Sequence, residues 1–366
     1  MEHPENNKEY EALKVNKGIA QPNPVNPNLA ERLKNISKKK LGVEDYVSGI
    51  LKGDINILSQ AITLVESSKI EHQKIAQEVI KRCLPSAGHS IRIGITGVPG
   101  AGKSTFIESF GNLLTKENHK IAVLAIDPSS EVSKGSILGD KTRMESLAIN
   151  PKAYIRPSPS AGSLGGVARK TREAMILCEV AGFDIILIET VGVGQSETAV
   201  HSMVDFFLLM QIAGAGDELQ GIKRGIMEMA DTVIINKADG NNIDRAELAK
   251  RQLATALHFF PPHESGVTTK VSTCSAYEGT GLVEIWNNIL EYCGETQKNG
   301  YFDKRRNNQA KYWMYETINE QLQSNFYNHN VEAIKQAEEK VMSHQESSFS
   351  AAFELLDKYF SEYNIK

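Results

Sequence analysis

The sequence of 366 residues contains few cysteines and no long apolar stretch. Its four cysteines are scattered and lack the Cys-x-x-Cys spacing of zinc clusters, which argues against a disulfide framework and favours a reducing compartment. The nine histidines are also dispersed, so no His-rich tract indicates metal storage or delivery. Because no run of about 18 apolar residues occurs, we expect no membrane-spanning segment.

An excess of positive charge is also missing. The formal net charge is −4, which predicts no overall basic field of the kind that binds nucleic acid or an anionic membrane. The first residues include several glutamates and no apolar core, so neither a secretory signal nor an acid-poor transit peptide is predicted. We therefore expect a cytoplasmic protein with no nucleic-acid or membrane partner.

One stretch of the chain has a strong ligand-binding signature. Behind the apolar run 91–96 the chain reads Gly97, Val98, Pro99, Gly100, Ala101, Gly102, Lys103, Ser104 and Thr105. This is a complete P-loop pattern, in which glycines let backbone N–H groups turn toward phosphate, Lys103 reaches the β- and γ-phosphates, and Ser104 holds Mg²⁺. The helix that should begin here adds the positive end of its dipole. A glycine-rich turn without a ligand would not require the full pattern, so we predict nucleotide binding.

The spacing of apolar residues indicates a parallel α/β core with helical segments before and after it. Short apolar runs predict strands at 91–96, 121–127, 154–156, 185–190, 206–212, 233–236 and 270–275. Helical patterns lie between them at 104–117, 164–181, 221–229, 245–259 and 282–292. We expect a mostly parallel P-loop NTPase sheet flanked by helices at 89–298, preceded by a flexible arm at 1–27 and a helical segment at 28–88. The aromatic residues of 299–366 follow helical spacing and should form core or a subunit interface.

A second motif indicates which base is bound. The strand predicted at 233–236 ends at Asn236, and Lys237, Ala238 and Asp239 come directly after it. At such a position the Asp239 carboxylate can accept hydrogen bonds from N1–H and the 2-amino group of guanine, a pair of donors that adenine lacks. Four such residues alone could form an ordinary turn. Their place after a P-loop, together with Ser275 and Ala276 at the end of another strand, makes guanine the expected base.

Several polar residues lie where Mg²⁺ and the γ-phosphate would be sensed, because ligands of such sheets bind beyond the carboxyl ends of the strands. Asp127 closes one predicted strand, Asp140 follows a Gly- and Ser-rich loop, and Glu189 stands near the end of a buried strand, as a Walker-B carboxylate does. Asp127 could instead begin a turn, whereas Glu189 would be costly there without a partner. Gln195 could orient a water molecule or cap a helix, and both interpretations stay open.

Together these motifs resemble the MeaB/ArgK family. The likeness covers about residues 40 to 345 and is carried by the segments 97–105, 127–130, 135–144, 189–197, 214–223 and 236–239. Members of this family are P-loop GTPases of the dimer-forming SIMIBI class. They serve adenosylcobalamin-dependent acyl-CoA mutases, chiefly methylmalonyl-CoA mutase. Residues 1–27 and the tail beyond about residue 345 match no motif of the family.

The resemblance implies a GTPase chaperone that gates cobalamin loading and protects or reactivates a mutase. It implies that Lys103 and Ser104 hold phosphate and Mg²⁺, that Asp127, Asp140 and Glu189 surround the metal, and that Asn236, Lys237 and Asp239 hold the guanine of GTP or GDP. Lys223, which by itself would be a surface lysine at a helix start, becomes a catalytic candidate in an additional switch loop. The C-terminal helices would form a homodimer, and hydrolysis would be slow until the partner stimulates it.

Three other functions stay open from the residues alone. A metallochaperone GTPase of the nickel-delivery type would need a His-rich arm or a Cys–His pair near the switches, and the sequence has neither. A phosphotransferase would need an acceptor pocket and a base, and no motif identifies them. A nucleotide-gated scaffold would bind GTP without meaningful turnover.

Overall fold

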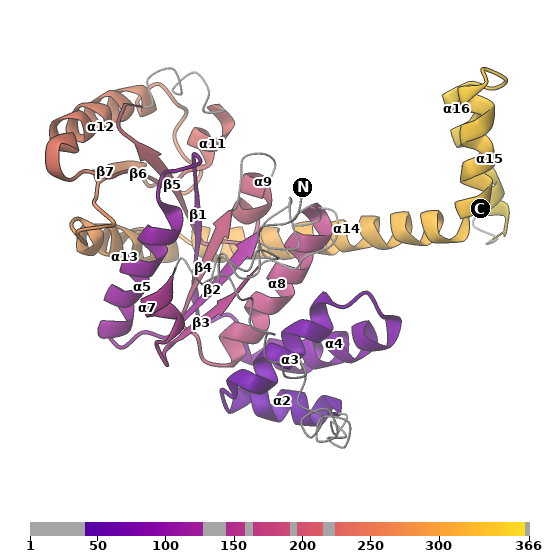
Figure 1. Cartoon of the computed structure of the whole chain (residues 1–366), viewed down its shortest axis with the longest axis horizontal. Coiled ribbons are helices and arrows are strands. Elements are labelled where there is room, and N and C mark those ends of the chain that lie inside the picture. The colour runs from indigo at the N-terminus through magenta and orange to yellow at the C-terminus, as the bar shows by residue number, and fades with distance from the viewer. Residues whose placement is uncertain (1–40, 127–143, 158–163, 191–195, 215–223, 363–366) are drawn as a thin grey trace, which may run out of the picture. The chain divides into compact units, whose positions relative to one another are not determined.

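The computed structural model describes residues 41–126, 144–157, 164–190, 196–214 and 224–362 (Figure 1). The flexible arm predicted at 1–27 lies outside these residues. From Val43 onward the chain forms one compact unit. The described residues contain seven strands, which are β1 (Ile91–Gly97), β2 (Ile121–Ile126), β3 (Ala153–Arg156), β4 (Ile185–Thr190), β5 (Phe206–Ile212), β6 (Thr232–Asn236) and β7 (Lys270–Thr273).

These strands form one sheet in the order β3-β2-β4-β1-β5-β6-β7, and every neighbouring pair is parallel. The predicted parallel fold is therefore confirmed, and each apolar run predicted as a strand corresponds to one of them. β1 lies in the middle of the sheet. The chain passes from β1 to β2 on one side and later from β4 across β1 to β5 on the other. The carboxyl end of β1 is thus the switch point at which sheets of this kind bind ligands.

Several predicted boundaries were wrong, among them both ends of the helix predicted at 245–259, which spans Ile243–Leu257. β7 ends at Thr273 rather than at residue 275, because Ser275 leaves the parallel ladder and its N–H donates to the backbone oxygen of Thr280 at 3.1 Å. Helix α13 (Leu282–Lys298) continues beyond residue 292, because Cys293 and Thr296 extend its buried face at helical spacing. Two short helices, α7 (Glu145–Ala148) and α9 (Ser196–His201), were not predicted.

Helices cover both faces of the sheet. On one face α5 (Lys103–Lys116), α7 and α13 pack against alternate residues of the strands, such as Ile93 and Ile95 of β1. On the other face α11 (Arg224–Met229) and α12 (Ile243–Leu257) pack against β5 and β6, while α8 (Leu164–Val180) and α9 contact β4 and its neighbours. Successive residues of a strand point to opposite faces, so burial of both faces explains the nearly continuous apolar runs.

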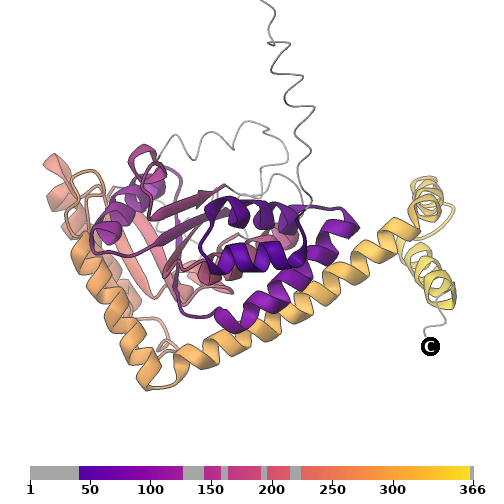
Figure 2. The same ribbon diagram turned by 90° about the horizontal axis from the view of Figure 1, so that it is seen from below.

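Further helices extend this core. α2 (Val43–Leu51), α3 (Ile55–Glu66) and α4 (Ile70–Cys83) pack on one another and on α8. After α13 come α14 (Tyr301–His329), α15 (Val331–Met342) and α16 (Ser348–Glu362). α14 contacts α8 and, as Figure 2 shows, extends as one long helix to α15 and α16, which pack on each other. Within the described ranges, no helix is both long and apolar enough to cross a bilayer.

An aspartate precedes each of the strands β4, β5 and β6 at the amino edge of the sheet. Each carboxylate accepts a backbone N–H from a neighbouring segment: Asp184 from Lys120 at 2.7 Å, Asp205 from Arg92 at 2.9 Å, and Asp231 from Phe207 at 2.8 Å. Buried backbone donors need such partners. The repeated contact aligns the starts of the central strands.

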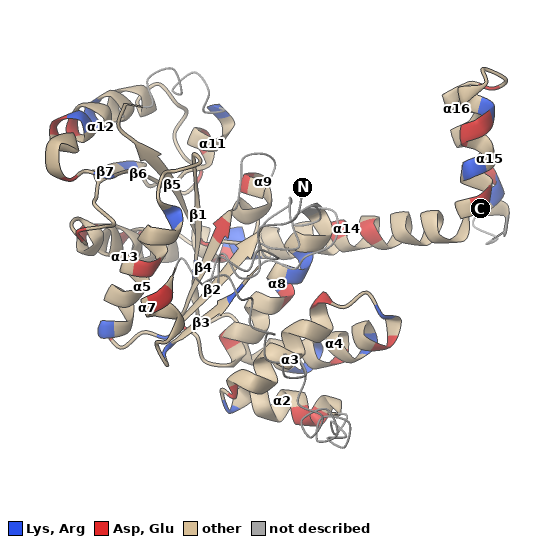
Figure 3. Cartoon of the chain, in the orientation of Figure 1, with Lys and Arg blue, Asp and Glu red and all other residues tan. Residues whose placement is uncertain are grey.

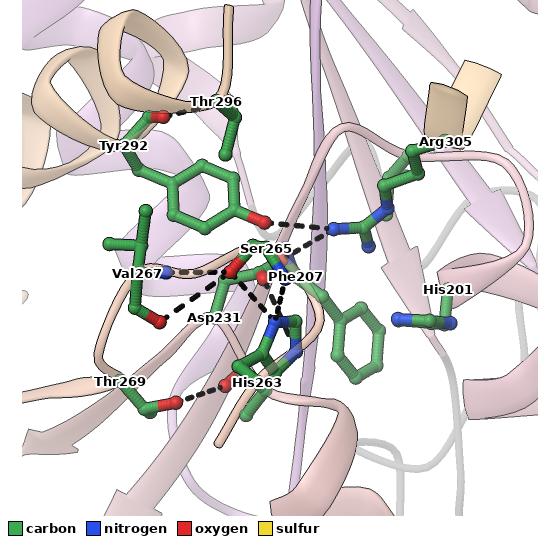
Figure 4. Close-up of polar contacts among 12 residues, drawn as sticks. His201, Phe207, Asp231, His263, Ser265, Val267, Thr269, Tyr292, Thr296 and Arg305 are labelled. Atoms are coloured by element: carbon green, nitrogen blue, oxygen red, sulfur yellow. Dashed lines mark hydrogen bonds and ion pairs between the residues drawn. The ribbon is translucent and has the colours of Figure 1, made fainter. Parts of the chain in front are cut away.

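The first turns of α14 bind two of these aspartates, of which Asp231 is shown with Arg305 in Figure 4. Arg305 Nη1 lies 3.0 Å from Asp231 Oδ2 and donates to the Tyr292 hydroxyl at 3.2 Å. Arg306 reaches both carboxylate oxygens of Asp205 at 2.7 Å. Burial alone would lower the pKa of the Arg305 guanidinium, but Asp231 and Tyr292 hold that pKa above its ordinary value. α14 is therefore anchored at the amino edge of the sheet, opposite the carboxyl end of β1.

Candidate functional site

The P-loop connects β1 to α5 at the centre of the sheet. Gly97 has no room for a side chain, since a Cβ atom there would lie 2.3 Å from the backbone oxygen of Met210 in β5. Gly102 precedes α5 with a φ of +86°, and a Cβ atom on it would lie 2.8 Å from the amide nitrogen of Asn236. The two glycines therefore allow the loop to turn closely over β5 and β6 before α5 begins at Lys103.

Lys103 is half-buried, and its ammonium group lies within the loop. Its Nζ donates to the backbone oxygen of Gly97 at 2.9 Å. Burial lowers the pKa of the ammonium, while the charges of Glu189 and Glu197 act in the opposite direction. A phosphate oxygen is a stronger, charge-assisted partner than a backbone carbonyl. The position of Lys103 is therefore suited to binding the phosphates of a nucleotide.

Ser104 contacts a carboxylate on the neighbouring strand. β4 pairs with β1 so that Glu189 lies beside Ile95, and Glu189 is only 5% exposed. Ser104 Oγ donates to Glu189 Oε1 at 3.1 Å. Hydroxyl and carboxylate oxygens are hard ligands of the kind that Mg²⁺ prefers. The pair therefore fits a magnesium ion.

Asn236, at the end of β6, joins the P-loop to the segment after β7. Its Nδ2 donates to the backbone oxygen of Ala101 at 2.7 Å, and its Oδ1 accepts the N–H of Ala276 at 3.0 Å. The residue is 1% exposed. The resemblance implied that Asn236 helps to hold the guanine. The structure shows that its side-chain amide links two loops of the protein, and its role toward the base stays a prediction.

Asp239 is oriented by the same segment after β7. The Ser275 hydroxyl donates to Asp239 Oδ2. Lys237 has a φ of +60°, a left-handed conformation that is uncommon for lysine, and its backbone oxygen accepts a hydrogen bond from Asn242 Nδ2 at 2.7 Å. Segments 236–239 and 275–276, which the sequence proposed separately, are thus adjacent. A carboxylate held in this way can accept two neighbouring N–H groups of guanine.

Four predicted site residues, Asp127, Asp140, Gln195 and Lys223, lie outside the described residues, so their roles stay predictions. In the described part of the chain, no three His, Cys, Asp or Glu side chains converge in a way that could hold a metal ion. The pair of Ser104 and Glu189 is therefore the part of the predicted metal site that the structure describes.

Two features near the P-loop were not predicted from the sequence. The Thr190 hydroxyl donates to the Thr96 hydroxyl at 3.0 Å and links the ends of β4 and β1. Glu197, in the first turn of α9, is 4% exposed, and its charge acts on Lys103. Glu197 is the last residue of segment 189–197, one of the segments that carry the family resemblance. An acidic residue at a helix start is normally solvated, and its burial becomes visible only in the folded chain.

A cavity of about 700 Å³ lies away from this site. It is lined by α11, the end of α12 and the loop before β7, including Met227, Leu257, Phe260 and His263. None of the predicted site residues that the structure describes lines it. The candidate site is therefore defined by converging loops at the carboxyl edge of the sheet and not by this cavity.

The arrangement defines a class of protein. A parallel sheet has a P-loop after its central strand, a serine–carboxylate pair beside that loop, and an Asn-Lys-x-Asp segment bonded to it. These are the elements of a P-loop nucleotide-binding protein.

Comparison with known proteins identifies the family. The family model described as methylmalonyl Co-A mutase-associated GTPase MeaB matches residues 58–331, and the chain belongs to this family. GTPase ArgK of Escherichia coli K12 is 46% identical over 283 residues, which are 77% of this chain and 86% of that protein. The mitochondrial methylmalonic aciduria type A homolog of Mus musculus is 44% identical over 338 residues, 89% of this chain and 81% of that protein.

A solved structure supports the same fold. The crystal structure of a LAO/AO transport system kinase has 35% sequence identity and a TM-score of 0.68, and the match covers 87% of this chain and 97% of that one. The protein is accordingly a GTPase, which converts GTP and water to GDP and phosphate. The resemblance stated from the motifs is confirmed. Because the mouse relative is named as mitochondrial, the cytoplasmic location stays a prediction.

Proposed function

We propose that this GTPase is a chaperone for an adenosylcobalamin-dependent acyl-CoA mutase, namely methylmalonyl-CoA mutase, and that it gates cobalamin loading and protects or reactivates the mutase. The observation that carries this proposal is the family match over residues 58–331, whose description names association with methylmalonyl-CoA mutase. The name of the mouse relative, which refers to methylmalonic aciduria, points in the same direction.

The geometry around the P-loop supports binding of GTP with Mg²⁺. Ser104 Oγ and Glu189 Oε1 are 3.1 Å apart and would hold the ion, with Asp127 and Asp140 completing its carboxylate ligands. When bound, Mg²⁺ neutralises charge on the β- and γ-phosphates. Lys103 would exchange the Gly97 carbonyl for the same phosphates. Its ammonium would then stabilise the charge that develops as water attacks the γ-phosphate in line.

Three side chains would position the attacking water or regulate its attack on the γ-phosphate. Glu189 lies close to the phosphate cradle through its hydrogen bond to Ser104, and Gln195 follows it in the chain by six residues. Lys223 would approach the nucleotide when the mutase binds. Hydrolysis would then be slow for the protein alone and faster in the complex, because one catalytic group depends on the partner.

Guanine would bind beside the loops that Asn236 holds together. Asp239, oriented by Ser275, would accept the two N–H groups of the base. Lys237 and Ala276 would line the same subsite. Lys237 lies two residues before Asp239, and the N–H of Ala276 donates to Asn236. The ligands are therefore GTP and its product GDP.

We also propose a homodimer through the C-terminal helices. Leu322 on α14 and Phe349 and Phe353 on α16 have exposed fractions of 58%, 77% and 68%. From Leu322 to His329 α14 contains no Lys, Arg, Asp or Glu, and this end of the helix is tan in Figure 3. Exposed apolar patches of this kind mark protein contacts on soluble proteins.

Recovery of the partner tests the proposed function. The tagged protein is loaded with GDP or with a non-hydrolysable GTP analogue and used to capture proteins from a lysate of the source organism. We expect mass spectrometry to identify a cobalamin-dependent mutase whose yield differs between the two nucleotides. The Lys103→Ala variant, which should bind phosphate poorly, serves as the control and should lose that difference. Absence of any cobalamin enzyme from both samples would contradict the proposal.

A phosphotransferase is the second candidate, because the similar solved structure is described as a kinase. With GTP labelled at the γ-phosphate, a phosphotransferase would place the label on a protein or a small molecule. Hydrolysis releases the label as free phosphate. Thin-layer separation of the products distinguishes these outcomes.

A further inference from the structure

Helix α9 links the surroundings of the P-loop to the amino edge of the sheet. Its Val200 lies directly on β1, since a Cβ atom on Gly94 would be 2.7 Å from Val200 Cγ1. α9 also packs on β4, whose Glu189 accepts a hydrogen bond from Ser104 of the P-loop. The second residue of α9, Glu197, is 4% exposed, and the charge of this carboxylate raises the pKa of Lys103, which burial lowers. A displacement of α9 would therefore move a buried carboxylate that influences the P-loop lysine.

The other end of α9 is bonded to α14. The last carbonyl groups of a helix have no partner within that helix. Trp313 Nε1 donates to the backbone oxygen of Ser202 at 3.0 Å. Gln309 Nε2 donates to the backbone oxygen of Val204 at 2.7 Å and also contacts that of His201 at 3.5 Å. Side chains of α14 thus satisfy the carbonyl groups at the end of α9 and in the turn that leads to β5.

These two side chains belong to one face of α14. Arg306, Gln309 and Trp313 follow one another at intervals of three and four residues, which places them in a line along the helix. Arg306 binds Asp205, the last residue of the same turn. Gln309 and Trp313 are 6% and 7% exposed. The turn 202–205 is therefore held along its length by a single buried face of α14.

We propose that Gln309 and Trp313 are positioning residues of the GTPase. By holding the turn 202–205 they fix α9, and with it Glu197, relative to Lys103, although they bind at the opposite edge of the sheet. The same hydrogen bonds couple the nucleotide site to α14, because a shift of α9 must either break them or move α14. This inference rests on the GTPase activity and not on the partnership with a mutase.

Steady-state hydrolysis tests the positioning role. Trp313→Phe keeps an aromatic ring and removes the N–H donor, and Gln309→Met keeps the chain length and removes the amide. Each variant should lower kcat about tenfold and change KM less than about twofold, because the geometry of the reacting groups is disturbed and nucleotide binding is not. The matched control is Tyr312→Phe, which removes a hydroxyl from the adjacent, 46% exposed residue and should retain the kcat of the unmodified protein.

Tryptophan fluorescence supplies a second measurement that needs no change at Gln309 or Trp313. The chain contains two tryptophans, so Trp286→Phe leaves Trp313 as the reporter. We expect its emission to differ between the GDP complex and that of a non-hydrolysable GTP analogue. Identical emission in both complexes would overturn the coupling.

The values of kcat and KM can also overturn the positioning role. An unchanged kcat in both Trp313→Phe and Gln309→Met would overturn it. So would a rise in KM equal to the loss in kcat, because that pattern indicates general disturbance of the site. Circular dichroism first establishes that each variant is folded, and where one of them is not, the other variant and the fluorescence of Trp313 decide.

Discussion

Side chains from three distant segments hold one another at the candidate site. Asn236 bonds to Ala101 of the P-loop and to Ala276 after β7, while Ser275 orients Asp239. Both ends of the Asn236 amide bond to the protein, so this residue positions the loops against each other. Under the proposed function, recognition of the base would depend on the carboxylate of Asp239.

Asp239→Asn should change the base that the protein prefers. The amide NH₂ can donate to the 2-oxo group of xanthine but cannot accept from the 2-amino group of guanine. We expect GTP affinity to fall and xanthosine triphosphate affinity to rise, measured by competition against a fluorescent nucleotide. Asp244→Asn, the same change at an exposed residue of α12, is the control and should leave both affinities unaltered. Unchanged GTP affinity in Asp239→Asn would count against guanine recognition by this residue.

Gly94→Ala should destabilise the protein through α9. The added Cβ atom would lie 2.7 Å from Val200 Cγ1 and 3.0 Å from Phe207 Cδ2, and overpacking of this kind costs about 1–3 kcal/mol. Urea unfolding should show this loss, and Val200→Ala in the same chain should recover part of it. Gly294→Ala is the matched control, because apart from the adjacent residues and nearby backbone of its own helix no described atom lies within 4 Å of its Cβ position. Equal stability of the two alanine variants would disprove the close packing of α9 on β1.

At the scale of elements, ion pairs more than an apolar stripe attach α14 to the sheet. Arg305 and Arg306 bind Asp231 and Asp205, which also order the starts of β5 and β1 through backbone N–H groups. Breaking a buried pair leaves a charge without compensation, and this costs more than the pair itself contributes. The helix and the amino edge of the sheet should therefore unfold together.

Asp231→Asn tests this coupling of elements. The change leaves the guanidinium of Arg305, which is 7% exposed, without a carboxylate partner. We expect the free energy of unfolding to fall by about 3–5 kcal/mol in urea titrations. Asp303→Asn, in the exposed first turn of α14, should change it by less than about 0.5 kcal/mol. If both variants unfold at the same urea concentration, the ion pair does not anchor α14.

For the whole molecule, the exposed aromatic residues of the C-terminal helices predict association. Phe349→Asp combined with Phe353→Asp places two charges on the apolar face of α16. We expect this variant to sediment as a monomer and the unmodified protein to sediment as a dimer. Phe259→Asp is the control, because Phe259 is also highly exposed, at 82%, but lies just after α12 and not on the C-terminal helices. A dimer that persists in the double variant would place the subunit interface elsewhere.

The sheet was predictable because its physical signal is local. Strands buried on both faces require continuous apolar runs, and helices of a dozen residues or more show a clear period. α7 and α9, with four and six residues, are too short to establish such a period. Spacing also cannot tell whether a buried aromatic face meets the same chain or a second copy. Trp313, for example, proved to bond within the chain.

By itself, the sequence determined the chemistry of the candidate site, because phosphate binding and base recognition depend on short runs of specific residues, as in 97–105 and 236–239. The tertiary structure decided how these runs are held. Asn236 as a link between loops, the burial of Glu197, and the bond from Trp313 to Ser202 join residues far apart in sequence, 111 positions in the last case. Such contacts arise from packing of whole elements, and no local pattern of residues encodes them.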